Sequence, residues 1–322
     1  QTAFGENQTK SNDGAWTNGL AVFKKKGSSE YVVSVAGTNF FGASSFLYED
    51  QNVCGKGMPN PGLKSYTDIN PAKTSANKTV IWHGVYLGVK ALRDGTGQVA
   101  DKTEAKLLDF LKTETGCSTT NKCSLTVVGH SLGATLTPAM ALLIKDSAPN
   151  FQVTAVRLLA APAPGLPSFA DYYSKQLGAV TTSLVNKKDL VPLCLIGDSM
   201  VNDIPDLWKT NSCTGNFSVF SNDAEKALFL AWVVGHDLCG ARVALSEGVH
   251  VLPDSSTTFF DSQVDAVRVN GEMVVECPAT GKYQATEGTY QHITRYFNHL
   301  FNDDGESFLK FTGQCPENKK SC

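Results

Sequence analysis

The sequence predicts an α/β fold with a mostly parallel central sheet flanked by helices. Apolar, β-branched runs of strand length alternate with helical patterns between residues 80 and 185, which is typical of β-α-β units. One such strand and helix are joined by Gly129–Gly133, a G-x-S-x-G motif. With 322 residues, 42% of them hydrophobic, the chain can bury one large core, so we expect a single domain over 1–322.

The N-terminal part of the chain predicts an irregular arm followed by a β-hairpin. Residues 1–19 are polar and rich in glycine and asparagine. Leu20–Phe23 and Tyr31–Val35 are apolar runs of strand length, and the polar Lys24–Glu30 between them is typical of a hairpin turn. Residues 36–39, Ala-Gly-Thr-Asn, predict a second turn directly after the hairpin.

Segment 40–50 is crowded with bulky side chains. Five of them fall within nine positions, with small residues between them: Phe40, Phe41, Phe46, Leu47 and Tyr48. Such a segment is either an ordinary buried helix or a mobile lid that covers an apolar cleft. The sequence leaves both interpretations open, and the five residues are candidates for a lid and for binding an acyl chain.

Two helices are predicted before the motif. Residues 51–79 are rich in Gly, Pro, Asn and Lys and indicate a loop. Val80–Arg93 predicts a short entry strand and a helix that Gly95 ends. Asp101–Thr115 has an apolar face at helical spacing and stops at Gly116.

The G-x-S-x-G motif stands in the context that it requires. Leu125–Val128 predicts a buried strand before it, and Leu132–Lys145 predicts a helix after it. A turn this sharp strains the backbone of Ser131 and exposes its hydroxyl near the positive end of the following helix. Gly129 and Gly133 leave room for the strand and the helix to approach each other.

The next elements continue the alternation. Val153–Ala160 predicts a strand, Pro167–Leu177 a helix and Ala179–Val185 another strand, with Asp189 shortly after its end. Catalytic groups in open α/β sheets gather at the carboxyl ends of the strands. Both Ser131 and Asp189 are expected at such ends.

The C-terminal third contains a longer region, 194–288, before the last predicted helix, Thr289–Phe301. Within that region, Asp223–Ser246 has an apolar helical pattern. Val264–Val269 and Glu272–Glu276 predict a hairpin, because Asn270 and Gly271 between them favour a type I′ turn.

A serine hydroxyl is a weak nucleophile and needs a histidine to take its proton and a carboxylate to orient that histidine. After a G-x-S-x-G turn, the acid and then the base follow in the chain. Asp189 is favoured as the acid by its position after a strand, and His292 as the base by its position at the start of the last helix. The weaker rivals are Asp198, Asp203 and Asp206 for the acid, and His236, His250 and His299 for the base.

Composition restricts the partners and the compartment. The net charge is −3 and no basic stripe is present, which argues against a nucleic-acid partner. Nine cysteines without a C-x-x-C pair indicate several disulfides and an oxidising compartment rather than a metal site. Local bridges are plausible between Cys117 and Cys123 and between Cys315 and Cys322, while the remaining pairing stays open.

Several features are typical of a secreted, extracellular protein. The chain opens on Gln1, as a processed form would, and contains no signal peptide and no apolar run long enough to span a bilayer. Sequons at Asn7, Asn77 and Asn216 are acceptors for N-glycans in such a compartment.

Four segments resemble the class 3 lipase family, the fungal triacylglycerol lipase type, and especially its longer secreted basidiomycete members. They are VVSVAGTN at 32–39, VVGHSLGA at 127–134, NKKDLVP at 186–192 and HITRYF at 292–297. The resemblance covers roughly residues 30–192 and 289–301, and the motif around Ser131 is its most specific part. It implies the α/β-hydrolase fold.

The resemblance also implies roles for individual residues. Ser131 would be the nucleophile, Asp189 the acid and His292 the base. Thr38 and the backbone N–H of Leu132 would form the oxyanion hole, and segment 40–50 falls where the family carries its lid.

Two features depart from the family pattern. The family commonly has arginine before the Gly-Thr turn, where this chain has Ala36, so the support of the oxyanion loop must differ. The acid and the base are 103 residues apart (292 − 189), more than in compact members. The added region, 194–288, is either a second wall of the acyl site or extra core.

We therefore expect a lipase that hydrolyses water-insoluble lipid esters through an acyl-enzyme, at an oil–water or membrane interface and without a metal or cofactor. One alternative is a carboxylesterase for soluble, aromatic or sterol esters, with segment 40–50 as a fixed wall. Another is a catalytically inactive hydrolase-fold protein that binds lipid. The same triad also serves proteases, although nothing else in the sequence favours one.

Overall fold

The computed structural model describes residues 2–10, 16–37, 63–76, 79–99, 104–113, 116–193, 196, 203, 248–252, 256–260, 266–269, 272–275, 292, 296 and 299–300. The chain divides into two compact units. The first comprises Gln1–Leu184, Leu195–Gly197 and His236–Thr258, and the second comprises Val185–Cys194, Asp198–Gly235 and Phe259–Cys322. The single-domain organisation over 1–322 stays a prediction.

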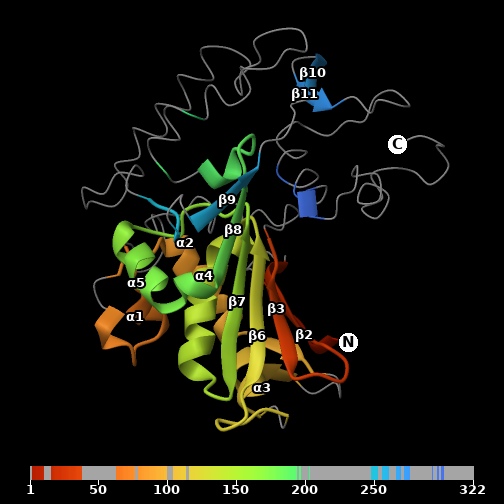
Figure 1. Ribbon diagram of the computed structural model, residues 1–322, viewed down its shortest axis with the longest axis vertical. Helices are drawn as coiled ribbons and strands as arrows, with labels where there is room; N and C mark the ends of the chain where they lie inside the picture. The colour runs from red at the N-terminus through yellow and green to blue at the C-terminus, as the bar shows by residue number, and fades with distance from the viewer. Residues whose placement is uncertain are drawn as a thin grey trace, which may run out of the picture. The chain divides into compact units, whose positions relative to one another are not determined.

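Among the described residues, seven strands form one sheet in the order β1-β2-β3-β6-β7-β8-β9 (Figure 1). Strands β3, β6, β7 and β8 run parallel to one another, and β1, β2 and β3 are antiparallel neighbours. This confirms the predicted α/β fold with a mostly parallel centre. The bounds are β1 Thr2–Lys10, β2 Trp16–Lys24, β3 Glu30–Val35, β6 Cys123–His130, β7 Phe151–Leu159, β8 Thr181–Asn186 and β9 Thr257–Phe260.

The N-terminal arm differs from the prediction, because residues 2–10 form β1 instead of an irregular segment. Strand β1 pairs antiparallel with β2, which itself starts at Trp16 and not at Leu20. The strand lies at the edge of the sheet, where polar sequences are common. The side-chain pattern therefore carries little strand signal, and pairing with β2 supplies the backbone hydrogen bonds.

The predicted hairpin of β2 and β3 is confirmed. Its register runs from Leu20 opposite Val35 to Lys24 opposite Tyr31. An ion pair of 3.0 Å between Lys25 Nζ and Glu30 closes the turn. The hairpin places β3 next to β6, with which β3 pairs in parallel.

Two helices precede the central strand β6. The helix α2 spans His83–Asp94, and the N–H of Gly95 ends it by donating to the carbonyl of Ala91, at 2.9 Å. The helix α3 spans only Leu107–Thr113, because Glu104–Lys106 form strand β5 against β4, Thr96–Gln98. The predicted helix over 101–115 is thus too long at its start, since cross-strand pairing with β4 replaces its first turn.

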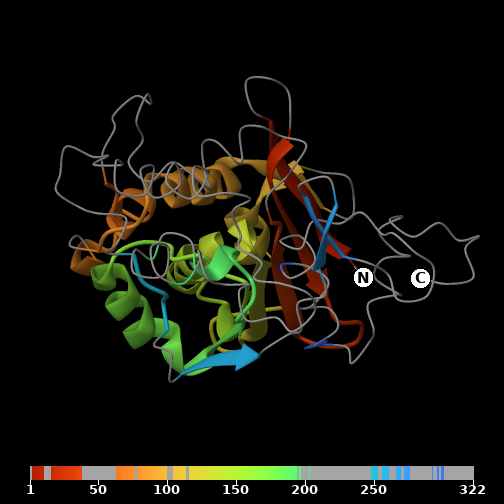
Figure 2. The ribbon, with the colours of Figure 1, turned by 90° about the horizontal axis from the view of Figure 1, so that it is seen from above.

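The helix α4, Leu132–Ser147, is the centre of the helical layer. Every residue from Leu132 to Ile144 is buried, and the helix packs on β6 and β7. It also contacts α2 and α5, which lie on either side of it (Figure 2). The helix α5, Pro167–Leu177, has the predicted bounds, and strand β8 follows it after a 3-10 turn.

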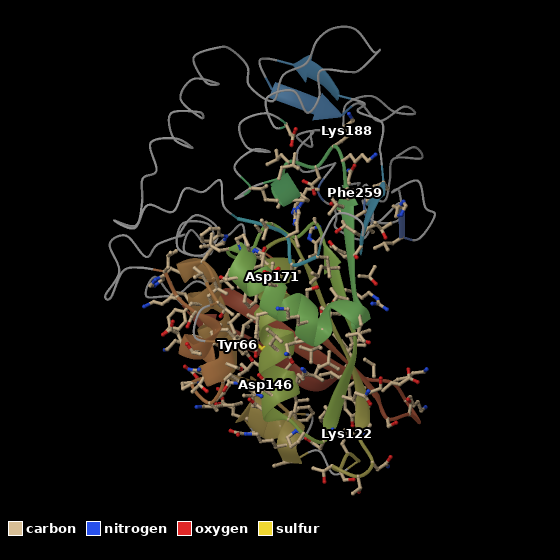
Figure 3. All side chains as sticks on the ribbon, turned by 60° about the vertical axis from the view of Figure 1, so that its left-hand side comes forward. Tyr66, Lys122, Asp146, Asp171, Lys188 and Phe259 are labelled. Atoms are coloured by element: carbon tan, nitrogen blue, oxygen red, sulfur yellow. A yellow bond between two sulfur atoms is a disulfide. The ribbon has the colours of Figure 1, made fainter. Side chains whose placement is uncertain are left out.

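A polar cluster ties the segment before α2 to the end of α4. Tyr66, in the short helix α1 (Tyr66–Ile69), donates its hydroxyl proton to Asp146 at 3.0 Å (Figure 3). Lys73 forms an ion pair of 2.8 Å with the same carboxylate. Burial raises the pKa of Tyr66, so the hydroxyl remains a donor at every physiological pH. The predicted loop 51–79 therefore contains ordered structure in its second half.

In the second unit, β10 (Ala266–Val269) and β11 (Glu272–Val275) form the predicted hairpin, with Val269 opposite Glu272. The turn residues 270–271, the predicted lid 40–50 and the predicted helix 223–246 lie outside the described residues. None of the helices built from described residues combines the length and apolarity needed to cross a bilayer.

Candidate active site

Ser131 lies at the turn between β6 and α4, in a backbone conformation that residues other than glycine rarely adopt. Its φ is 59° and its ψ is −131°, so the turn is strained at this residue. The N–H of Ser131 donates to the carbonyl of Leu159 on β7, at 3.0 Å, which holds the turn in place. The residue is 8% exposed. This is the strained strand–turn–helix that the G-x-S-x-G motif predicts.

The two glycines of the motif allow the turn to close. A Cβ at Gly129 would lie 2.4 Å from the carbonyl oxygen of Gly133. A Cβ at Gly133 would lie 2.4 Å from the carbonyl oxygen of Val35, at the end of β3. Real Cβ atoms do not approach so closely, so any larger residue at either position would push the strand and the helix apart.

The turn after β3 lies beside Ser131. A Cβ at Gly37 would lie 3.0 Å from the carbonyl oxygen of His130 and 3.5 Å from the Cβ of Ser131. Thr38, the predicted oxyanion-hole residue, is next in the chain and lies outside the described residues. The N–H of Leu132 is in the first turn of α4, where no carbonyl of the same helix can accept its hydrogen bond.

The structure brings together the predicted acid and base, which are both in the second unit. Nδ1 of His292 lies 2.8 Å from Oδ2 of Asp189, although the residues are 103 positions apart. Asp189 is fully buried and His292 is 5% exposed. A short contact between a buried carboxylate and an imidazole is the arrangement that orients a histidine and stabilises its cation.

A compact turn after β8 fixes the carboxylate. The side-chain oxygen of Asn186 accepts the N–H of Lys188 at 3.1 Å, and its carbonyl accepts the N–H of Asp189 at 3.0 Å. Oδ1 of Asp189 then accepts the N–H of Val191 at 2.9 Å. Asn and Asp side chains favour such turns because they accept hydrogen bonds from the backbone two residues further on.

Sequence reasoning missed two residues next to the pair. Asn186 and Tyr296 lie in the segments 186–192 and 292–297, yet neither receives a role from the sequence. In the structure, the N–H of Asn186 donates to the hydroxyl of Tyr296 at 2.8 Å, and both residues are buried. The spacing of Asn186 and Asp189 was a usable signal, because it suits a turn with side-chain hydrogen bonds. The position of Tyr296 four residues after His292 was a weaker one.

The rival histidines lie elsewhere or outside the described residues. The ring of His299 stacks on Phe260, with ring centroids 4.2 Å apart. His250 belongs to the first unit, where it lines a pocket. His236 and the rival Asp198 and Asp206 are not among the described residues.

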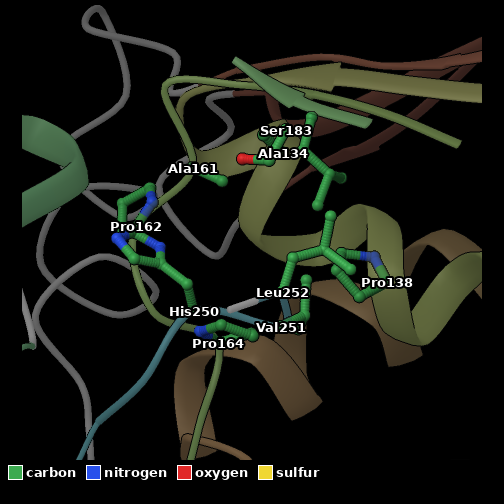
Figure 4. A pocket seen from close by; sticks show the side chains of 10 residues that line it. Ala134, Pro138, Ala161, Pro162, Pro164, Ser183, His250, Val251 and Leu252 are labelled. Carbon is green, nitrogen blue, oxygen red and sulfur yellow. The ribbon is translucent and has the colours of Figure 1, made fainter. Parts of the chain in front are cut away.

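The pocket lies in the first unit and is mostly apolar (Figure 4). Its empty volume is about 230 Å³, including the space that is open to solvent. Ala134 and Pro138 contribute to it from α4, three and seven positions after Ser131, which places them on one face of the helix. The lining residues are Ala134, Pro138, Leu158, Ala161, Pro162, Pro164, Ser183, His250, Val251 and Leu252.

Within the described part of the chain, no group of three or more His, Cys, Asp or Glu side chains is arranged to hold a metal ion. The predicted local disulfide is confirmed between Cys117 and Cys123, whose Cα atoms are 5.3 Å apart. The other seven cysteines lie outside the described residues.

Solved structures support the fold. The crystal structure of M37 lipase is similar over 98% of this chain and 86% of its own, with a TM-score of 0.68 and 19% identity. At that identity the likeness shows the fold alone. A mutant of MDLA from Penicillium cyclopium and the Rhizomucor miehei triacylglyceride lipase match with TM-scores of 0.38 and 0.37, at 18% and 17% identity. They cover 57% and 59% of this chain, and 54% and 60% of their own.

Sequence comparison gives a match to a family model and none to an individual protein with a curated description. The model of the family Lipase (class 3) matches residues 64–197. That segment contains both the strained Ser131 and the buried Asp189. The part of the chain that carries the candidate nucleophile and acid is therefore similar in sequence to the class 3 lipases.

Proposed function

We propose that the protein is a secreted serine hydrolase of the class 3 lipase type that cleaves carboxylic ester bonds of water-insoluble lipids. The observation that carries the proposal is the strained backbone of Ser131 between β6 and α4, within a segment similar to the class 3 lipases. A protein gains no stability from such strain, which suggests that its purpose is to present the hydroxyl at the tip of the turn.

Catalysis would begin with attack of the Ser131 oxygen on the ester carbonyl. Nε2 of His292 accepts the hydroxyl proton, and Asp189, 2.8 Å from Nδ1, stabilises the resulting imidazolium. The tetrahedral intermediate then collapses as His292 returns the proton to the leaving alcohol. Water then attacks the acyl-enzyme while His292 accepts its proton. Collapse of the second tetrahedral intermediate releases the acid, and His292 returns the proton to the Ser131 oxygen.

The N–H of Leu132 and the residue Thr38 would bind the oxyanion of the tetrahedral intermediate. The Leu132 amide is at the positive end of α4, and the end of β3 lies against the same helix start. A single preorganised donor of this kind lowers the barrier by about 3 kcal/mol. Ala36 stands where the family commonly has arginine, so close packing of β3 on Gly133 would supply the support.

The acyl chain of the substrate would occupy apolar surface near Ser131. The pocket beneath the first two turns of α4 offers such surface through Ala134, Pro138 and Leu252. Phe40, Phe41, Phe46, Leu47 and Tyr48 would cover the ester as a lid that opens at an oil–water or membrane interface. The confirmed disulfide and the sequons at Asn7, Asn77 and Asn216 support secretion with N-glycans.

The replacement Ser131→Ala tests the mechanism. We expect it to abolish hydrolysis of a p-nitrophenyl ester while the melting temperature stays nearly unchanged. Ser124→Ala is the matched control, because Ser124 is on β6, the strand that leads to the turn of Ser131, and its hydroxyl bonds Thr154. A fluorophosphonate should label the natural protein and Ser124→Ala but not Ser131→Ala. Full activity of Ser131→Ala would refute the mechanism, and a natural protein without label would be an inactive lipid-binding homologue.

A carboxylesterase for soluble esters, with segment 40–50 as a fixed wall, is the second candidate. Rates across the solubility limit of a short triglyceride separate the two functions. A lipase with a working lid accelerates when an emulsion forms, whereas an esterase follows ordinary saturation below that limit.

A further inference from the structure

We propose that Leu252 limits the length of the acyl chain that the pocket beside α4 accepts. The inference rests on the proposed function, because it deepens the assignment of this pocket to the acyl part of the ester. Leu252 belongs to region 194–288, which by sequence is either a second wall of the acyl site or extra core. In this assignment, its segment 248–252 is part of the wall.

The pocket begins close to Ser131. Ala134 lies three positions after Ser131 on α4, which is about 4.5 Å along the helix axis. Ala161 follows Leu159 by two positions, and the carbonyl of Leu159 accepts the N–H of Ser131 at 3.0 Å. The wall formed by α4 and the wall that follows β7 therefore both start beside the nucleophile turn.

The sheet order places the pocket on the side of Ser131 that faces away from β3. Strand β6 lies between β3 and β7. Gly37 follows β3, and a Cβ there would lie 3.5 Å from the Cβ of Ser131. The pocket residues Leu158 and Ser183, in contrast, belong to β7 and β8. An ester bound at Ser131 with its carbonyl oxygen toward the turn after β3 thus has the pocket on its other side.

Leu252 lies at the far end of the pocket. Pro138 is seven positions after Ser131, which is about 10 Å along α4. A Cβ at Gly178 would lie 3.9 Å from a terminal methyl carbon of Leu252. Gly178 precedes the amino end of β8, whereas Ser131 follows the carboxyl end of β6, which runs in the same direction. The Leu252 side chain therefore closes the pocket at the end away from the nucleophile.

Backbone contacts hold segment 248–252 in place. The N–H of Val249 donates to the carbonyl of Gly165 at 3.1 Å. Gly165 itself packs tightly on the chain before α2, because a Cβ there would lie 2.3 Å from the carbonyl oxygen of Val80. Leu252 is only 3% exposed. A wall that is fixed in this way sets a length limit, because it does not move aside for a longer chain.

The lining suits an alkyl chain of limited length. Eight of the ten lining residues are alanine, proline, leucine or valine, and none is Asp, Glu, Lys or Arg (Figure 4). The empty volume of about 230 Å³ includes the space open to solvent. At about 30 Å³ for a group of the size of a water molecule, it holds about seven carbon atoms at most. Replacing Leu252 by alanine removes three carbon atoms from the far end and makes room for a longer chain.

The test measures kcat/KM for p-nitrophenyl esters from acetate to palmitate in the natural protein, Leu252→Ala and Leu252→Val. In the natural protein we expect kcat/KM to decrease for chains longer than octanoate. Leu252→Ala should raise the ratio of decanoate to butyrate hydrolysis about tenfold, because two further methylene groups enter the pocket. Leu252→Val should change the ratio in the same direction by a smaller factor, with a smaller loss of stability.

Leu107→Ala is the matched control, because Leu107 is also buried, belongs to α3 and does not line the pocket. Active sites are counted by fluorophosphonate labelling, so partial unfolding does not alter the ratios. Unchanged ratios in both Leu252 variants would show that Leu252 is extra core and would overturn the inference. An equal change in Leu107→Ala would also overturn it.

The alcohol part of the ester provides a second arm of the test. Acetate esters of alcohols of increasing length should keep their relative rates in Leu252→Ala. If instead the preference changes with the alcohol and not with the acid, the pocket holds the alcohol, and the inference is overturned. If the natural protein itself takes no fluorophosphonate label, the proposed function fails, and this role fails with it for that separate reason.

Discussion

The turn that carries Ser131 and the pair formed by Asp189 and His292 are built in opposite ways. Backbone contacts determine the first: two glycines allow an approach of strand and helix that no side chain would permit. Side-chain hydrogen bonds determine the second, between residues 103 positions apart. The nucleophile is therefore a product of local chain geometry, whereas the acid and base depend on a long-range contact.

The difference has a physical consequence for mutation. A glycine contact is lost through steric overlap, which affects the whole fold because α4 and β6 are both in the core. A side-chain hydrogen bond can be removed with little change of volume, so it affects the chemistry more than the stability. Three variants, taken from the largest expected effect to the smallest, test this contrast.

The largest effect is expected for Asp189→Asn. The amide keeps the shape of the carboxylate but favours the wrong tautomer of His292, so kcat should fall by about 10⁴-fold. The melting temperature should change little. Asp146→Asn is the control, since it makes the same chemical change at a carboxylate bound to Tyr66 and Lys73 in the first unit. Steady-state kinetics with a soluble ester measures both, and a decrease below tenfold for Asp189→Asn would contradict the assigned role.

A smaller but still large effect is expected for Gly129→Ala, this time on stability. The new methyl group would overlap the backbone of Gly133, at 2.4 Å, so we expect the free energy of unfolding to fall by about 3 kcal/mol. Gly19→Ala is the matched control, because its Cβ would lie an ordinary 3.5 Å from the Cβ of Ala36. Urea denaturation gives both values. Equal stability of the two variants would show that the turn is not held by this approach.

The smallest effect is expected when Cys117 and Cys123 are both replaced by alanine. The bridge closes a loop of sequence separation 6, so its loss should cost about 2 kcal/mol in the free energy of unfolding. It is at the start of β6, at the opposite end of the strand from Ser131. We therefore expect kcat to be unchanged at a temperature where both proteins are folded. A lower kcat would mean that the glycine contacts alone do not determine the geometry at Ser131.

Much of the fold could be predicted from the sequence where a strong periodicity of apolar residues coincides with burial in the core. The predicted strand Leu125–Val128 lies within β6, and the predicted helix from Leu132 follows it as α4. The helix Pro167–Leu177 has the predicted bounds because a proline starts it and a glycine follows it. In each case the local pattern and the tertiary environment favour the same structure.

The misses occur where pairing outweighs local pattern. Thr2–Lys10 has no apolar alternation, yet it forms β1, because backbone hydrogen bonds to β2 do not depend on side-chain type. Glu104–Lys106 continues a helical pattern, yet it pairs with β4. Propensity in such short segments is weak, and a partner strand easily overrides it.

The same contrast between local pattern and tertiary pairing applies to the candidate site. The sequence by itself determined the turn at Ser131, because a glycine on each side and the strand and helix around it are local features that sterics alone require. It nominated Asp189 and His292 among several rivals but gave no contact between them. Only the tertiary structure decided that they meet and that Asn186 and Tyr296 support them, because hydrogen bonds across 103 residues depend on how the whole chain packs.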